Sequence, residues 1–218
     1  MKLNYGDSAA QKVSERYAAP VATLTELKGI PADRRVDGMQ VLVMADGSRW
    51  RFLAAGALTG DDLLIVTPTA GSGTWLRLPG AVDLRIAIAF GTADTTALLT
   101  MQAGQLLAVE RTAWEITADW TGGTASAIGL SSSVNRGTDF TAKGDLLGGA
   151  TGDVAAALTA ALGFTAGTIG TDMDTLTKTR RLVLKSADTV KFDRITSAFT
   201  AGTGYAHIIG NLLTNAGA

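Results

Sequence analysis

The sequence predicts an all-β protein: an antiparallel β-sandwich or jelly-roll-like barrel, with a small N-terminal β-meander and a short helical N-terminal arm. Apolar and polar residues alternate with period two in many short runs. Turn-forming Asp, Gly and Ser residues separate these runs at the spacing of about 8–12 residues that is typical of sandwiches and barrels. No internal repeat of about 20–50 residues indicates a solenoid or propeller. We therefore divide the chain into an arm (1–35), a meander (36–80) and a sandwich domain (81–218).

The arm is rich in Ala, Glu, Lys, Gln and Leu, which favour helices. Pro20 and Pro31 divide it into short pieces, because proline removes a backbone donor and clashes with the preceding turn. From residue 21 to residue 30, an apolar residue recurs at every third position. These residues form a stripe that is too short to build a core of its own. We expect this stripe to anchor the protein to a partner; it consists of Val21, Leu24, Leu27 and Ile30.

The meander begins with a hairpin. Alternating residues from Met39 to Val43 and from Trp50 to Phe52 flank the turn Ala45-Asp46-Gly47-Ser48. Asp and Gly tolerate the positive φ that tight turns demand, so the pair marks the reversal. We expect Ser48 to be exposed at this turn. The segments "LLIVTP" and "TWLRL" supply two more strands.

The remainder of the chain carries further strand patterns. They lie in "VDLRIAIAFG", "LLAVERTAWEIT", "AIGLSSS", "RRLVLKSADTVKFDRITSAF" and "GTGYAHIIGNLL". Between them, "GDVAAALTAALG" reads as a helix with Asp153 at its N-cap and Gly163 at its C-cap. A strand is the alternative for that segment, because Val and Thr suit strands equally well.

Composition limits the possible functions. Of 218 residues 46% are hydrophobic and 18% charged, and the net charge is −1. Charged residues usually make up about 25% of a protein, so this low share argues against a disordered chain and against a nucleic-acid-binding face. It also favours a surface that is covered by another subunit. The absence of cysteine excludes disulfides, thiolate metal sites and a cysteine nucleophile. No signal peptide is apparent, and no apolar run reaches the roughly 18 residues of a membrane span.

Catalytic patterns are not apparent. The single histidine, His207, alternates with Tyr205 and Ile209 and reads as a structural residue on a strand. No nucleophile elbow or phosphate-binding glycine loop occurs. Asp172 and Asp174 begin like a calcium loop, but the following residues do not continue the pattern. We therefore expect a protein that is not an enzyme and has no cofactor and no metal, although a glycosidase pair among the 20 acidic residues stays open.

The four tryptophans and one glycine-rich stretch are the other notable features. Trp50, Trp75 and Trp114 lie in alternating strands and read as core residues. Trp120 reads as a contact residue, with a carbohydrate platform as the alternative. It opens a stretch of small residues that ends at Asp153, and small residues allow close backbone approach. We expect this stretch to be buried between subunits through Gly122, Gly123, Ile128, Leu146 and Leu147.

Several motifs resemble those of a known group of proteins. Residues 34–80 contain an Arg-x-x-Gly-Met stretch, a Gly-Ser/aromatic hairpin, a "DDLLIVTP" strand and a Gly-x-Gly-x-Trp-Leu-Arg ending. Together these resemble a module near the N-termini of tailed-bacteriophage virion structural proteins. The stretches "WTGGTASAIGLSSS", "KGDLLGGATGD" and "FDRITSAFTAGTGYAHI" resemble the C-terminal part of phage virion proteins of about this length.

The resemblance implies a non-enzymatic structural role. The first expectation is a capsid decoration or cement protein that binds the phage head through protein–protein contacts. Its partners would be the major capsid protein or other virion proteins and further copies of itself, with a trimer favoured, and neither nucleic acid nor membrane. Its location would be the virion surface, after synthesis in the host cytoplasm. The alternatives are a tail or head-fibre base or adaptor protein, and a carbohydrate-binding or depolymerising receptor-recognition protein.

Overall fold

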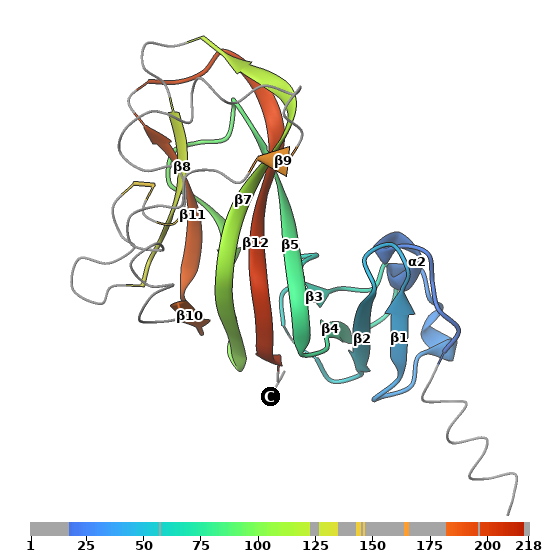
Figure 1. The fold of residues 1–218 in the computed structure, drawn as a ribbon. Helices are drawn as coiled ribbons and strands as arrows, with labels where there is room; N and C mark the ends of the chain where they lie inside the picture. Colours follow the sequence, from blue (N-terminus) through green and yellow to red (C-terminus); the bar gives the residue numbers. More distant parts are fainter. Residues whose placement is uncertain are drawn as a thin grey trace, which may run out of the picture. The chain divides into compact units, whose positions relative to one another are not determined.

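The computed structural model describes residues 18–56, 58–122, 127–134, 143, 144, 146, 164, 165, 182–195 and 197–215. They form an all-β protein with very short helices, so the predicted fold class is confirmed (Figure 1). The chain makes two compact units. Unit 1 comprises residues up to Pro79 and from Thr214 onward, and unit 2 comprises Gly80–Leu213.

Unit 1 contains one four-stranded sheet in the order β1-β2-β4-β3. Its strands are β1 (Gln40–Val43), β2 (Ser48–Leu53), β3 (Ile65–Val66) and β4 (Thr74–Arg77), and all the pairings are antiparallel. The predicted hairpin is confirmed, because Val43 pairs with Ser48 across the turn and Gly47 has a φ of 68°. The chain returns to this unit at its end, where Asn215 Nδ2 donates to the carbonyl oxygens of Leu64 and Arg77, each at 2.9 Å.

The described part of the arm packs on this sheet. It contains helix α2 (Leu24–Lys28), whose N-cap Thr23 accepts a hydrogen bond from the Glu26 amide, and the 3₁₀ turn η1 (Ala32–Arg34). The Val21 amide donates to the Leu42 carbonyl at 2.9 Å, next to β1. Leu27 has an exposed fraction of 0%, and the other stripe residues pack against the same core. The apolar stripe is thus used inside unit 1, and Leu27 offers no surface to a partner.

Two motif regions of unit 1 meet at one aromatic ring. The Arg35 guanidinium lies over the Phe52 ring, 5.2 Å from its centroid, and donates to the Ala70 carbonyl. Gly73 has a φ of 94°, and a Cβ there would come within 2.4 Å of the Phe52 ring. Phe52 in turn packs on Trp75, with 5.1 Å between ring centroids. The Arg-x-x-Gly-Met and Gly-x-Gly-x-Trp motifs are therefore parts of one packed cluster.

Ser48 is buried, contrary to the expectation of an exposed turn. Its exposed fraction is 5%, and its hydroxyl accepts a hydrogen bond from Trp50 Nε1 at 2.6 Å. The same hydroxyl donates to Asp46 Oδ1 at 2.6 Å. Burying the indole N–H requires such a partner, so the turn serine is a structural residue.

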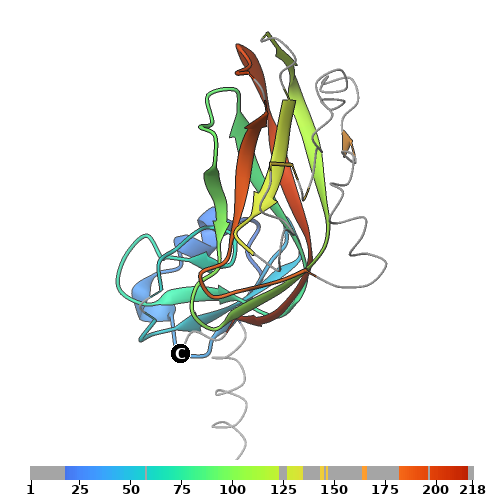
Figure 2. The ribbon, with the colours of Figure 1, turned by 90° about the vertical axis from the view of Figure 1, so that its left-hand side faces the viewer.

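Unit 2 contains two antiparallel sheets. The larger has the order β10-β7-β12-β5, with β9 also paired to β7. Its strands are β5 (Gly80–Ala89), β7 (Gln105–Thr121), β9 (Phe164–Thr165), β10 (Leu182–Lys185) and β12 (Ala201–Asn215). The smaller consists of β6 (Thr96–Thr100), β11 (Thr189–Ile195) and β8 (Ala127–Ser132). Figure 2 shows β11 between the green β6 and the yellow β8. The sequence analysis did not identify β6 or β9, which are short.

The core of unit 2 lies between its two sheets. Trp120 on β7 contacts Phe192 on β11, with ring centroids 6.5 Å apart, and meets Phe199 edge-on at 5.2 Å. Trp120 is 5% exposed and Trp114 is 0% exposed. The core assignments of Trp50, Trp75 and Trp114 are confirmed, whereas Trp120, predicted at a contact, belongs to the core as well.

Two further expectations concern helices. The helix predicted over 152–163 lies outside the described residues. Within the described part of the chain, no helix has the length and apolar character needed to cross a membrane.

Candidate functional site

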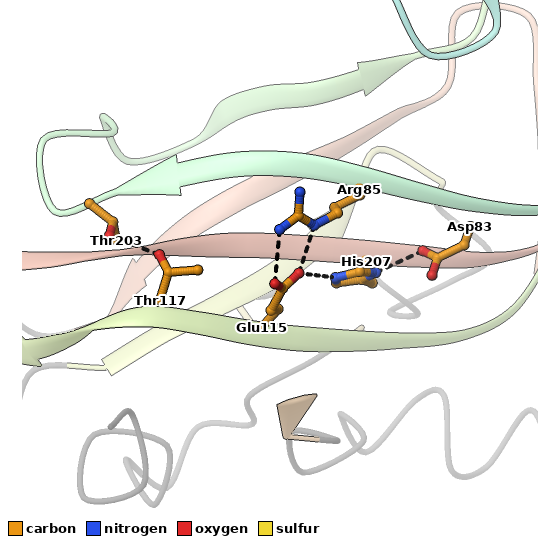
Figure 3. Close-up of polar contacts among 6 residues, drawn as sticks. All are labelled: Asp83, Arg85, Glu115, Thr117, Thr203 and His207. Atoms are coloured by element: carbon orange, nitrogen blue, oxygen red, sulfur yellow. Dashed lines mark hydrogen bonds and ion pairs between the residues drawn. The ribbon is translucent and has the colours of Figure 1, made fainter. Parts of the chain in front are cut away.

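The outward face of the larger sheet of unit 2 gathers the ionisable side chains of three strands. In β5 the inward Val82, Leu84 and Ile88 are buried, so the alternation turns Asp83 and Arg85 outward. β12 lies between β5 and β7, and His207 pairs directly with Arg85. Side chains from β5 and β7 therefore meet over β12 (Figure 3).

Arg85 and Glu115 form the centre of this cluster. Arg85 Nε donates to Glu115 Oε2 at 2.6 Å and Arg85 Nη2 donates to Oε1 at 2.8 Å, which is a bidentate pair. The guanidinium stacks on Tyr205, with Cζ 3.3 Å from the ring centroid. The hydrogen bonds from Arg85 lower the pKa of Glu115 from 4.5 to about 2, with His207 contributing in the same direction. The same pair raises the pKa of Arg85.

His207 joins two carboxylates. Its Nδ1 lies 2.8 Å from Asp83 Oδ1, and its Nε2 lies 3.1 Å from Glu115 Oε2. Carboxylates only accept hydrogen bonds, so a ring nitrogen of His207 makes its contact as an N–H donor. The His207 side chain is only 6% exposed. The histidine thus ties β12 to both neighbouring strands, as its predicted structural role requires.

The cluster, which we call the outer-face network, comprises Asp83, Arg85, Glu115, Tyr205 and His207. A general base works best with a pKa near the operating pH, and Glu115 lies far below it. On the same face, Thr117 Oγ1 and Thr203 Oγ1 bond to each other at 3.0 Å. The network is therefore arranged to hold three strands together.

A shallow hollow of about 360 Å³ adjoins the network. Ala87, Ala89, Thr117, Thr203 and Tyr205 contribute to its lining. The face of the Tyr205 ring is already covered by Arg85. Sugars commonly stack on exposed aromatic faces, and Arg85 occupies one such face of this ring.

A second polar cluster fastens part of the glycine-rich stretch to the core of unit 2. Asp193 is 1% exposed and accepts hydrogen bonds from Ser131 Oγ at 3.0 Å and from the Gly144 amide at 3.1 Å. Burial raises the pKa of the Asp193 carboxyl, while these hydrogen bonds oppose the rise. Lys143 pairs with Asp94 and donates to the Arg194 carbonyl at 2.8 Å.

The described members of the predicted interface are engaged within their own chain. Ile128 and Leu146 are both 0% exposed, and the Leu146 amide donates to the Leu130 carbonyl at 2.8 Å. Gly122 has a φ of 86°, and a Cβ there would lie 2.2 Å from Thr200 Oγ1. The close approach that small residues permit is therefore intramolecular at Gly122. Gly123 and Leu147 lie outside the described residues.

The outer-face network was not predicted from the sequence. The sequence pattern assigned no role to Asp83 or Arg85, and it did not distinguish Glu115 among the acidic residues. The one usable signal was the period-two pattern, which turns Asp83 and Arg85 to one face of β5 and Tyr205 and His207 to one face of β12. The pairing of these strands, about 120 residues apart in sequence, was not readable.

Neither a cluster of metal ligands in the described part of the chain nor a similar known protein points to a ligand for this site. Among the residues that the structure describes, no three or more His, Asp or Glu side chains are grouped so as to hold a metal ion. No protein-family model matches the chain, and neither a curated protein nor a solved structure is found to be similar to it.

Proposed function

We propose that this protein is a non-enzymatic structural protein of a tailed-bacteriophage virion, with capsid decoration or cementing as the leading role. The motif resemblance of residues 34–80 suggests the class of particle. The observation that supports a mechanical role is the outer-face network. Its Arg85–Glu115 ion pair and its His207 contacts join three strands of one sheet.

A decoration protein acts by adding buried contact area to an assembled shell. Its binding favours the intact particle by mass action, because it binds the assembled form and not the free subunits. Such a role requires a body that keeps its shape under load. The bidentate ion pair, the buried His207 and the buried aromatic core of unit 2 supply that rigidity.

The decisive experiment locates and counts the protein in purified particles of the phage that encodes it. Quantitative mass spectrometry measures the copy number relative to the major capsid protein, and gold-labelled antibodies against unit 2 show its position. A copy number comparable to that of the capsid protein, with label on the head, supports decoration. A few copies at the neck or tail support the fibre-base alternative.

Two results would overturn the proposal. The first is absence of the protein from purified particles that are otherwise complete. The second is release of sugars from host envelope polysaccharide by the full-length chain, which would favour the depolymerising receptor-binding alternative.

A further inference from the structure

We propose that a second copy of this chain pairs edge to edge with β5, antiparallel and centred on Leu84. This pairing does not depend on the virion role proposed above. It follows from the direction of the main-chain groups of β5, from the lack of protection along its edge, and from the order of its charged residues.

β5 is an edge strand whose outward main-chain groups can be assigned. No described strand pairs with the side of β5 that faces away from β12. The Phe90 amide donates to the Gly202 carbonyl at 2.9 Å, so the even-numbered residues turn their main chain toward β12. The Ala89 amide instead bonds to Thr92 Oγ1 at 3.0 Å. The N–H and C=O groups of Ala81, Asp83, Arg85 and Ala87 therefore point to the free edge.

This edge lacks most of the usual protection against pairing. Natural edge strands are often short, bulged or covered, or carry Pro or charged residues, Lys above all. The charged residues of β5 are Asp83 and Arg85, which have opposite signs. β5 is 10 residues long, contains neither Pro nor Lys, and pairs with β12 in a continuous register. Ala81, Asp83, Arg85 and Ala87 are all exposed, so the described part of the chain leaves these residues accessible.

The charges of β5 favour the twofold register that places opposite charges across from each other. In an antiparallel pair related by a twofold axis, centring on Asp83 or on Arg85 places like charges opposite each other, which is destabilising. Centring on Leu84 places Asp83 of each copy opposite Arg85 of the other. Ala81 then lies opposite Ala87, and the odd-numbered residues form the hydrogen-bonded pairs that the free edge requires.

The outer-face network leaves atoms for these new contacts. Arg85 binds Glu115 through Nε and Nη2, and its positive charge also attracts Asp83 of the second copy. Asp83 uses Oδ1 for His207, and its Oδ2 has no partner among the described residues. The pairing would therefore extend the network across the axis without breaking it.

Edge pairing buries little side-chain surface, so we expect a weak dimer that depends on protein concentration. Stable interfaces bury about 1,200–2,000 Å², and contacts below this range are typically transient. Disulfide trapping suits such a dimer. The chain has no cysteine, so introduced thiols report only the designed contact.

The test uses the full-length double variant Ala81→Cys/Ala87→Cys under mild oxidation. Within one strand these residues are about 20 Å apart, too far for an internal disulfide. Across the proposed pair their Cα atoms would be about 5.5 Å apart, within disulfide range. We expect a covalent dimer from the double variant and from an equimolar mixture of the two single variants, but not from either single variant alone.

A second pair of variants removes the edge hydrogen bond without new thiols. Ala87→Pro deletes an outward N–H at a position where an edge strand tolerates proline. Ala87→Ser keeps that N–H and serves as the matched control. By sedimentation across a concentration series, Ala87→Pro should weaken dimerisation about tenfold or more, since the symmetric contact loses two hydrogen bonds. Circular dichroism confirms that both variants are folded.

The outcomes decide the proposal. It is wrong if the folded double-cysteine variant yields no more covalent dimer than the single variants. It is also wrong if each single variant cross-links alone, because the register would then differ, or if Ala87→Pro and Ala87→Ser associate equally. Trapping of another protein's strand in place of a second copy would likewise contradict it.

Discussion

Replacing Glu115 by Gln removes the carboxylate that Arg85 and His207 share while keeping the shape of the side chain. A pKa lowered from 4.5 to about 2 corresponds to about 3 kcal/mol of folding free energy. Arg85 is 48% exposed and Glu115 27% exposed, so solvent screening reduces this figure. We expect Glu115→Gln to destabilise the protein by about 1–2 kcal/mol at neutral pH.

The pH dependence identifies the cause. Because the pKa of Glu115 is lower in the folded than in the unfolded chain, its contribution is complete above about pH 4.5 and is lost as the pH falls toward about 2. The difference in stability between wild type and Glu115→Gln should therefore be constant at neutral pH and shrink over this acidic range. Urea denaturation of both proteins, followed by circular dichroism at about pH 7 and about pH 2.5, measures it.

Glu110→Gln is the matched control, since Glu110 is another acid of β7 and accepts a hydrogen bond from Asn211 Nδ2 at 2.6 Å. Glutamine retains an acceptor for that bond, so the change should stay within about 0.5 kcal/mol. A Glu115→Gln variant as stable as wild type at neutral pH would refute a stabilising role of the Glu115 carboxylate. That role would also be contradicted if the destabilisation were equally large at both pH values.

Three further predictions concern unit 1. Gly73→Ala should destabilise unit 1 by about 2–4 kcal/mol in urea denaturation, because Gly73 has a φ of 94° and the Phe52 ring packs against it. In the control Gly47→Ala, the added Cβ meets no atom within 4 Å, so this change should cost only about 1 kcal/mol. Ser48→Ala should cost about 1–3 kcal/mol by leaving the buried Trp50 indole N–H unpaired; a stability equal to wild type would contradict the hydrogen bond. Leu27→Ala should lower the thermal midpoint by the equivalent of about 2–5 kcal/mol, whereas no change would return the residue to the role of a partner anchor.

The sequence by itself determined the all-β class and most strand positions. Period two is a property of the strand, and hairpin turns such as Asp46-Gly47 carry their own conformational signal. Burial of Trp50 was readable for the same reason, since it alternates with Arg49 and Arg51, and Trp75 and Trp114 likewise lie in strand segments. These features depend on residues close together in the chain.

Only the tertiary structure decided what the apolar residues touch. The apolar stripe from Val21 to Ile30 was readable as a stripe, but its partner is the sheet of the same unit. Trp120 was readable as an aromatic that needs a contact, and that contact is Phe192 and Phe199 of the same chain. Hydrophobic burial has no direction, so a pattern cannot distinguish an internal surface from one between subunits.

The outer-face network shows the same limit for charged groups. Asp83, Glu115 and His207 come from three strands, and they meet because β12 lies between β5 and β7 in one particular register. A shift of one residue in the pairing of any of these strands would turn the side chains of that strand to the opposite face of the sheet. The sequence determined which residues share a face of each strand, and the pairing of distant strands decided which of those faces came together.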